Sequence, residues 1–233
     1  MISICIPTYE MQGKGTEMLA RGFDILTQQT YKDFEVVISD NSEDDAIKDL
    51  CQNSLYQTLN IKYFKNPIKG MANNTNEAIK KANGELIKIL YMDDFLASKN
   101  SLQEIVDNFK GQWLVSGCEH YDGSKRYSPH YPTYTKKIYQ GENTIGSPSV
   151  LTIKNEKNLL TFDKNMTWLL DCDYYKRLYD KYGEPVLLNK VNVIIGTGKH
   201  QMTNILSDTA KKKERYYMAK KYKKRLLYML GLW

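Results

Sequence analysis

The sequence predicts an α/β fold in which a mostly parallel sheet is flanked by helices. Short apolar runs that are typical of buried strands alternate with stretches in which apolar residues recur at helical spacing. The early strand-like runs also stop at polar residues, as expected where open parallel sheets bind ligands beyond the carboxyl ends of their strands. A strand, helix, strand order of this kind favours right-handed crossovers and therefore parallel neighbours.

The alternation is clearest in residues 1–97. The expected strands are 2–6, 34–39, 61–64 and 86–90. The expected helices are 16–29, 44–55 and 71–82. This half contains no Gly-x-Gly-x-x-Gly motif and no phosphate-loop lysine motif. The absence argues against a dinucleotide site and against a phosphate-loop hydrolase.

Asp93 and Asp94 follow the buried strand that begins at Leu86. Two adjacent carboxylates repel and raise each other's pKa unless a cation lies between them. Their hard oxygen ligands suit Mg²⁺ or Mn²⁺. The alternative is a solvated turn or the cap of a helix that begins near Ser98.

Residues 98–204 have a different character. After a short strand at 113–116, the stretch 119–146 is polar and rich in tyrosine and histidine without a sustained period, which predicts a long ordered loop. Such side chains stack on sugars or bases, but they serve equally well to pack a loop onto its domain.

A helical pattern from Trp168 carries Asp171 and Asp173. Residues two apart on a helix point about 200° apart, so both cannot face one cleft. From spacing alone, Asp171 is either a helix cap or a catalytic base. Farther on, a glycine-rich loop at 196–201 carries His200, which is either a surface residue or a side chain that completes the coordination of a metal held by Asp93.

Composition and charge narrow the classes of protein to which this chain can belong. The chain has 233 residues and a net charge of +6. Its four cysteines are scattered, which indicates neither a zinc site nor a disulfide framework. No run approaches the roughly 20 apolar residues of a membrane span, and the start of the chain does not resemble a signal sequence, so we expect a cytoplasmic protein.

The basic charge is concentrated at 205–233, so the rest of the chain is close to neutral. This segment predicts a basic amphipathic helix that lies on an anionic membrane surface from the cytoplasmic side, or packs on the domain or on a second copy of the chain. Nucleic acid is the weaker alternative because no broader basic groove is indicated. The expected apolar stripe is Ala219, Tyr222, Leu226, Met229 or Leu230, and Trp233.

Taken together, these motifs resemble the inverting family-two glycosyltransferases with the GT-A fold, whose sheet is Rossmann-like. The resemblance covers about 2–203. The stretch Ser3-Ile-Cys-Ile-Pro-Thr-Tyr-Glu10 is similar to the opening strand of the family, and Val36-Val-Ile-Ser-Asp40-Asn-Ser to the next one. Tyr91-Met-Asp93-Asp94 is similar to the metal-binding Asp-x-Asp motif, with Tyr91 where many members have the first aspartate.

The resemblance implies roles for individual residues. In the stretch Leu170-Asp171-Cys-Asp173-Tyr-Tyr-Lys-Arg177-Leu, Asp171 matches the expected catalytic base. The implied metal ligands are Asp93, Asp94 and His200, and the implied acceptor or supporting residues are Asp173, Arg177 and Trp168. The implied donor-binding residues are Pro7, Thr8, Tyr9, Glu10, Asp40, Asn76, Tyr91, Met92 and Asp93.

The implied reaction is a direct displacement dependent on Mn²⁺ or Mg²⁺, from a nucleotide-diphosphate donor such as a UDP-sugar to a glycan or lipid-linked acceptor. Residues 1–97 would bind the donor, 98–204 the acceptor, and 205–233 would form a separate tail.

Two other classes of function stay open. A nucleotidyltransferase usually has a basic glycine-rich loop after its first strand, for which Gln12-Gly-Lys-Gly15 is a thin candidate. A non-catalytic module would bind a membrane or nucleic acid through its tail.

Overall fold

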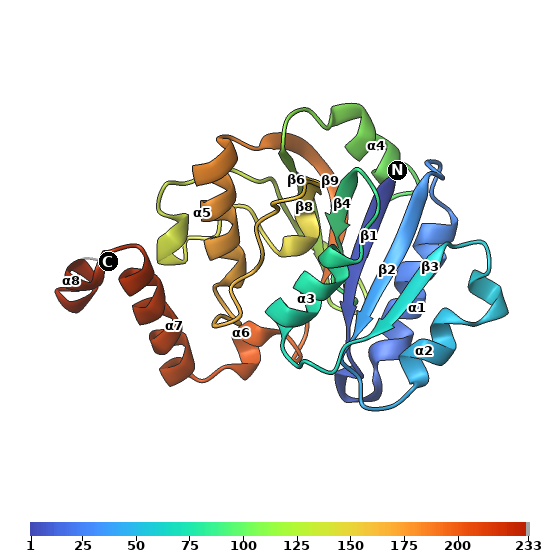
Figure 1. Ribbon diagram of the computed structural model, residues 1–233, viewed down its shortest axis with the longest axis horizontal. Helices are drawn as coiled ribbons and strands as arrows, with labels where there is room; N and C mark the ends of the chain where they lie inside the picture. Colours follow the sequence, from blue (N-terminus) through green and yellow to red (C-terminus); the bar gives the residue numbers. More distant parts are fainter. Residues whose placement is uncertain (232–233) are drawn as a thin grey trace.

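The computed structural model describes residues 1–231 and contains one nine-stranded sheet with helices on both faces (Figure 1). The strands are β1 Ile2–Thr8, β2 Phe34–Asp40, β3 Ile61–Lys65, β4 Leu86–Ile89, β5 Phe95–Leu96, β6 Trp113–Tyr121, β7 Arg126–His130, β8 Leu151–Lys154 and β9 Val186–Gly196. The α-helices are α1 Gly15–Thr27, α2 Ala46–Cys51, α3 Met71–Lys80, α4 Ser101–Asn108, α5 Leu170–Tyr182, α6 Met202–Ile205, α7 Asp208–Lys221 and α8 Arg225–Met229. Short 3₁₀ turns are η1 Met11–Gly13, η2 Ser54–Tyr56, η3 Ile138–Gln140 and η4 Pro148–Val150.

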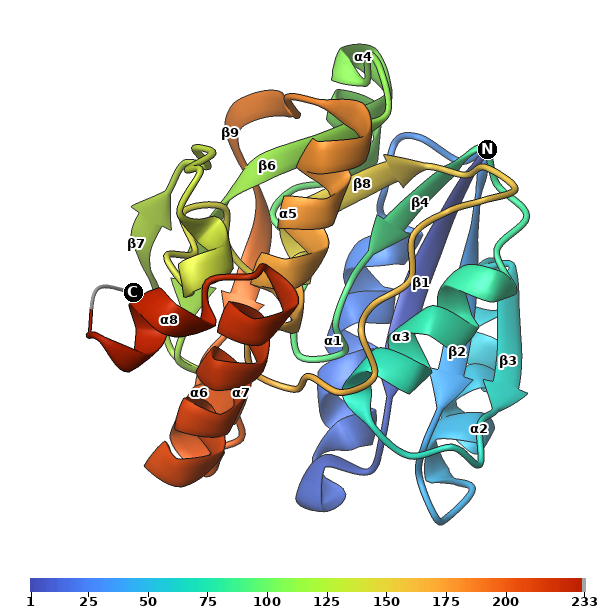
Figure 2. The same ribbon diagram turned by 60° about the vertical axis from the view of Figure 1, so that its left-hand side comes forward.

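The first four strands form the parallel sheet that the sequence predicts. Their spatial order is β3, β2, β1, β4, and every neighbouring pair is parallel. β1 and β2 are buried along their whole length, with α3 on one face and α1 on the other (Figure 2). The strand order reverses between β1 and β4, because β2 and β3 lie on one side of β1 and β4 lies on the other. Crevices at such switch points are where open sheets bind ligands.

The second half of the sheet is mixed rather than parallel. β8 is antiparallel to β4 and β6, whereas β6 and β9 are parallel. The expectation of a long loop at 119–146 is wrong in part, because β6 continues to Tyr121 and β7 pairs with it. β7 is exposed along most of its length, so it lacks the apolar alternation that would indicate a strand.

The basic segment does not form one continuous amphipathic helix. α7 and α8 are separated at Lys223, which has a left-handed φ of 57°. α7 packs on the domain: Met218 and Ala219 are buried, and the hydroxyl of Tyr222 donates to Asp173 at 2.8 Å. Trp233, the last residue of the expected stripe, lies outside the described residues. We therefore treat α7 as part of the domain and α8 as the tail.

Candidate active site

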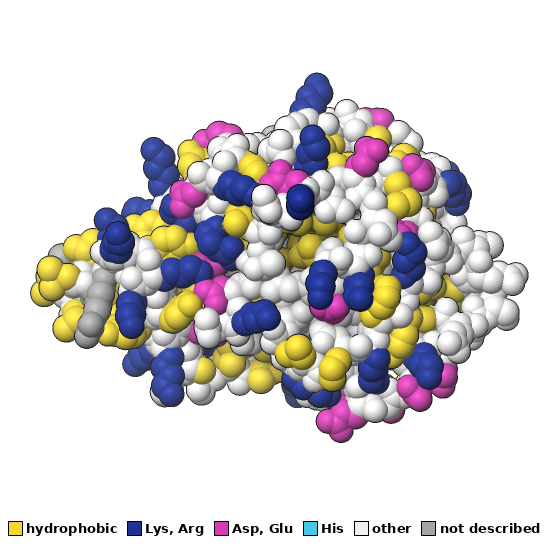
Figure 3. Space-filling view, viewed as in Figure 1, with side chains coloured by type: hydrophobic (Ala, Val, Ile, Leu, Met, Phe, Trp, Pro, Cys, Tyr) yellow, Lys and Arg dark blue, Asp and Glu magenta, His cyan; other side chains and the backbone are white. Residues whose placement is uncertain are grey.

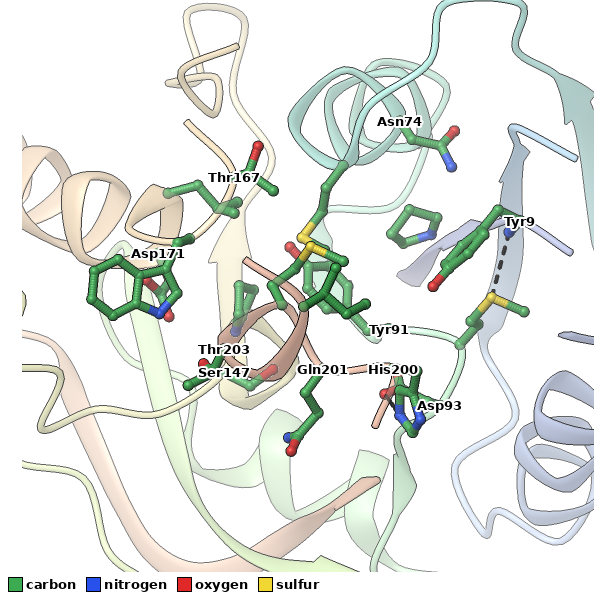
Figure 4. Close-up of a pocket in the computed structure, with 18 of the residues that line it drawn as sticks. Tyr9, Asn74, Tyr91, Asp93, Ser147, Thr167, Asp171, His200, Gln201 and Thr203 are labelled. Carbon is green, nitrogen blue, oxygen red and sulfur yellow. Dashed lines mark hydrogen bonds and ion pairs between the residues drawn. The ribbon is translucent and has the colours of Figure 1, made fainter. Parts of the chain in front are cut away.

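A cavity of about 710 Å³ opens beyond the carboxyl ends of β1 and β4, at the switch point of the sheet (Figure 4). One side is formed by the loops that follow these strands, and the other by the segment that leads into α5. The segment after β9, which includes α6, completes the lining. Residues from both halves of the chain therefore meet at one site.

Asp93 and His200 lie together on one side of this cavity. The Nε2 atom of His200 is 3.0 Å from Oδ2 of Asp93, although 107 positions separate them. The hydrogen bond to the carboxylate of Asp93 raises the pKa of the His200 imidazole. A Cβ atom on Gly196 would lie 2.4 Å from the carbonyl oxygen of Asp93, so glycine is required for the β9 loop to approach this closely.

Asp94 also lines the cavity, but its carboxylate holds the β9 loop. Its Oδ1 accepts the backbone N–H of Gly196 at 2.8 Å, and its Oδ2 accepts the hydroxyl of Ser147 at 3.4 Å. Burial, and then the charge of Asp93, raise the pKa of the Asp94 carboxyl. The structure thus separates two residues that the sequence analysis grouped as metal ligands.

Few side chains near Asp93 are placed to bind a metal ion. Within residues 1–231, no group of three or more histidine, cysteine, aspartate or glutamate side chains is arranged to hold a metal ion. Asp93 and His200 supply one oxygen and one nitrogen ligand, a combination that suits Mn²⁺ and other divalent ions. They fit an ion whose remaining ligands come from a bound diphosphate and water.

Asp171 faces the cavity from the side opposite Asp93, on the first turn of α5 (Figure 4). Its Oδ2 accepts a hydrogen bond from Nδ2 of Asn143 at 2.8 Å, and its Oδ1 accepts one from the N–H of Cys172 at 2.7 Å. Burial raises the pKa of the Asp171 carboxyl to about 6. A fixed carboxylate with a pKa in this range suits a general base at neutral pH.

Asp173 and Arg177 do not reach the cavity. The fully buried Asp173 carboxylate pairs with Arg177 and with Lys221, each at 2.7 Å. It therefore joins α5 to α7, and the divergence of the two aspartates deduced from helix geometry is present in the structure. Trp168, by contrast, lines the cavity.

Most of the expected donor-binding residues line the cavity: Pro7, Tyr9, Glu10, Tyr91, Met92 and Asp93. The backbone N–H of Tyr9 donates to the sulfur of Met92 at 3.4 Å, which joins the β1 and β4 loops. Oε2 of Glu10 is buried and has no hydrogen-bond partner among the described residues. It is thus an acceptor that a ligand can satisfy.

Three of the expected donor-binding residues lie outside the cavity lining. Thr8 donates to the buried carboxylate of Asp40 at 3.2 Å, and that carboxylate also accepts the hydroxyl of Tyr63 at 2.8 Å. Asn76 forms a reciprocal pair with the backbone of Phe162: its Nδ2 donates to the carbonyl at 2.9 Å, and its Oδ1 accepts the N–H at 2.7 Å. Each of these side chains is occupied by the protein itself.

Other lining residues were missed by the sequence analysis. They include Asn41, Asn74, Asn143, Ser147, Gln201 and Thr203. Asn74 is two positions from Asn76 on α3 and so points to the opposite side of that helix. Helix geometry applied to α3 would have separated the two residues, but no sequence signal marks Asn143.

Comparison with known proteins identifies the family. The family model described as Glycosyl transferase family 2 matches residues 3–197. The chain belongs to this family. Both the family and the α/β GT-A type of fold expected from the sequence are thereby confirmed.

Individual relatives are more distant. A GalNAc(5)-diNAcBac-PP-undecaprenol beta-1,3-glucosyltransferase of Campylobacter jejuni is 31% identical over 99 residues, which are 42% of this chain and 31% of that protein. S. aureus TarS 1–349 in complex with UDP-GlcNAc has a TM-score of 0.68 at 18% identity, covering 97% of this chain and 66% of that one.

A third relative is the mannosyltransferase PcManGT from Pyrobaculum calidifontis, in complex with GDP-Man and Mn²⁺. It has a TM-score of 0.57 at 17% identity and covers 84% of this chain and 56% of that chain. This family-two chain thus spans about a third of the curated relative and about a half to two thirds of these two solved structures.

Proposed function

We propose that this chain is an inverting glycosyltransferase that moves a sugar from a nucleotide-diphosphate donor, such as UDP-GlcNAc, to a hydroxyl group of a glycan or lipid-linked acceptor. The observation that carries the proposal is that Asp171 faces the Asp93–His200 pair across a single cavity (Figure 4). One side carries a base for the acceptor, and the other carries ligands for a cation that accompanies a diphosphate. Membership of the family and the similarity to a UDP-GlcNAc complex support the same reaction.

Asp171 removes the proton from the acceptor hydroxyl as that oxygen attacks the anomeric carbon of the donor. The bond from the anomeric carbon to the diphosphate breaks on the opposite face of the sugar, so the configuration inverts. Asn143 and the N–H of Cys172 hold the base in place. No covalent intermediate is required, and Asp171 supplies the proton acceptor.

Asp93 and His200 would hold Mn²⁺ or Mg²⁺ beside the diphosphate. When bound, such an ion neutralises the charge that develops on the leaving group. We assign Asp94 to the support of the β9 loop instead, because both of its oxygens already accept hydrogen bonds. The Mn²⁺ in the PcManGT complex supports a metal-dependent reaction.

Donor preference tests the proposal directly. We expect UDP-sugars with Mn²⁺ to raise the melting temperature of the protein and to release UDP when an acceptor is present, because binding to the folded state stabilises it. Nucleoside triphosphates under the same conditions are the control. Stabilisation and turnover by triphosphates, with no response to any nucleotide sugar, would favour a nucleotidyltransferase and contradict the proposal.

We also propose that α8 contacts an anionic membrane surface from the cytoplasmic side. Leu226, Met229 and Leu230 are 69%, 65% and 62% exposed. Basic side chains surround this end of the molecule (Figure 3), and Lys212, Lys213 and Lys220 of α7 line a shallow cleft beside Tyr228 of α8. None of the described helices is long and apolar enough to span a bilayer, so contact would be at the interface.

Vesicle binding tests this contact. We expect the full chain to co-sediment with phosphatidylglycerol vesicles at low salt, since each basic residue near the surface adds about 1 kcal/mol to the apolar contribution. The combined variant Leu226→Glu, Met229→Glu and Leu230→Glu should stay in the supernatant. Leu55→Glu is the matched control, because Leu55 is also exposed but lies on η2, which is distant in the sequence.

Equal sedimentation of the combined variant and the full chain would contradict the proposed surface. A full chain that stays in the supernatant would leave self-association through α8 as the alternative. Light scattering of the full chain and of the combined variant would then show whether the glutamates dissociate a dimer.

A further inference from the structure

Glu214 of α7 binds the backbone of the segment that leads into α5. Its Oε1 accepts the N–H groups of Thr167 at 2.9 Å and Trp168 at 3.1 Å. Its Oε2 accepts the N–H groups of Trp168 and Leu169, both at 2.9 Å. Hydrogen bonds to an ionised carboxylate are roughly twice as strong as neutral ones, so three consecutive N–H groups are fixed by one side chain.

The segment 167–169 lines one side of the cavity, and Asp171 lies two residues beyond it. α5 begins without a capping side chain, because Leu169 occupies the N-cap position. Glu214 takes over part of that role by accepting the N–H group of Leu169 and by placing a negative charge near the positive end of the helix dipole. The start of the helix that carries Asp171 is thus held by a residue about 45 positions later in the chain.

α7 is itself anchored around Glu214. The guanidinium of Arg215 and the ammonium of Lys211 lie over the Trp168 ring, 5.2 and 5.8 Å from its centroid. At the other end of the helix, Lys221 pairs with Asp163 at 2.6 Å and with Asp173 at 2.7 Å. These contacts fix the helix against the domain on both sides of the Glu214 carboxylate.

We propose that Glu214 is a positioning residue of the active site, which holds the 167–169 segment, and with it Asp171, in the geometry that acceptor activation requires. The role rests on the proposed glycosyl transfer. A displacement of about 1 Å in a reacting group can lower a rate about 10²-fold, so loss of these hydrogen bonds acts on kcat. The KM for the donor should be unchanged, because Tyr9, Tyr91 and Asp93 lie on other elements.

The charge of Glu214 has a second effect on Asp171. Burial is the main cause of the raised pKa of the Asp171 carboxyl, and the negative charge of Glu214 raises it further. The Cys172 thiol and the Tyr91 and Tyr175 hydroxyls also face Asp171, and burial raises the pKa of each of them, so they are neutral near pH 7. Neutralising Glu214 should therefore move the acid limb of the rate profile to lower pH, because the base then stays ionised to lower pH.

Two variants separate the geometric effect from the charge effect. Glu214→Gln keeps the size of the side chain but turns an amide NH₂ toward backbone N–H groups. We expect kcat to fall about 10- to 100-fold, the donor KM to stay unchanged, and the acid limb to move to lower pH. Glu214→Asp keeps the charge on a shorter side chain, so kcat should fall while the acid limb stays in place. Asp208→Asn, which makes the same change of carboxylate to amide at an exposed position of α7, is the control and should match the wild type.

Hydrogen exchange gives a readout that does not depend on turnover. The backbone amides at 167–169 should exchange faster in Glu214→Gln than in the wild type or in Asp208→Asn. If the amides at 167–169 exchange at the wild-type rate in a folded Glu214→Gln protein, the proposal is overturned. A lower kcat with an unshifted acid limb in Glu214→Gln also overturns it. If Glu214→Gln does not fold, Glu214→Asp carries the test, and a wild-type kcat in that variant is the contrary result.

The exchange experiment also separates this inference from the proposed function. If the wild-type protein transfers no sugar from any donor, the proposed function fails. The exchange rates at 167–169 still decide whether Glu214 fixes this segment.

Discussion

Replacing Asp171 by asparagine is expected to lower kcat by a factor of about 10² to 10⁴, the usual contribution of a positioned general base, and to leave donor affinity nearly unchanged. Asparagine retains the shape of the side chain and can still accept from Asn143, but it cannot take the proton of the acceptor. Steady-state kinetics with saturating donor, together with calorimetric titration of the donor, measure the two effects separately.

The pH profile of the wild-type enzyme gives a second test of Asp171. Since burial raises the pKa of its carboxyl to about 6, the ionised form is lost as the pH falls through that value. We expect the rate to decrease as the pH falls below about 6. A rate that is independent of pH between 5 and 8 would contradict the assignment of Asp171 as the base.

Asp173→Asn is the matched comparison for Asp171→Asn. Asp173 is buried with Arg177 and Lys221 as partners, so its neutralisation leaves two cationic groups without their counter-charge. Removing one partner of a buried ion pair costs about 3–5 kcal/mol, so this variant should lose stability rather than kcat. The reverse pattern, with turnover lost only in Asp173→Asn, would mean that the base has been assigned to the wrong aspartate.

The second large effect is expected for Asp93→Ala, which should abolish the part of donor binding that depends on a divalent ion. Asp93 carries one of the two side-chain ligands proposed for the ion, and its charge raises the pKa of the neighbouring Asp94 carboxyl. Its removal therefore relieves repulsion and should not unfold the protein. Titration of a UDP-sugar with Mn²⁺ and with EDTA measures the loss, and thermal unfolding checks the fold.

Asp94→Asn provides the contrast for Asp93→Ala. Its carboxylate holds the Gly196 N–H and the Ser147 hydroxyl, so the expected consequence is a lower melting temperature with a smaller loss of Mn²⁺ dependence. Mn²⁺-dependent donor affinity that is unchanged in Asp93→Ala would remove Asp93 from the metal site. Asp94 would then become the better candidate.

Features set by local chain geometry could be predicted from the sequence. The apolar run before Asp93 placed that residue at a strand end, and the helical spacing around Asp171 showed that it and Asp173 diverge. These two inferences use only the period of a strand or a helix. For His200 the sequence left a surface residue and a partner of Asp93 as alternatives, and the structure brings His200 to Asp93.

Features that depend on contacts between distant segments could not be predicted in this way. Asn76 was taken for a ligand-binding residue by the order of motifs, but its amide is engaged by the backbone of Phe162. The continuous apolar stripe from Ala219 onward is interrupted at Lys223, because the preceding turn packs on the domain. In the sequence, Glu214 is one acidic residue of a basic helix, and no sequence pattern indicates that it binds the backbone of 167–169.

The pair between Asn76 and Phe162 has a consequence for how substrates enter. It joins α3, within residues 1–97, to the segment before α5, within residues 98–204. Separating these two halves would therefore break two hydrogen bonds, each worth about 0.5–1.5 kcal/mol. α6, by contrast, is a single turn without a buried residue, and its residues Met202 and Thr203 line the cavity together with the preceding Gln201. We therefore expect the entry of ligands to depend on movement of this short segment rather than on separation of the two halves.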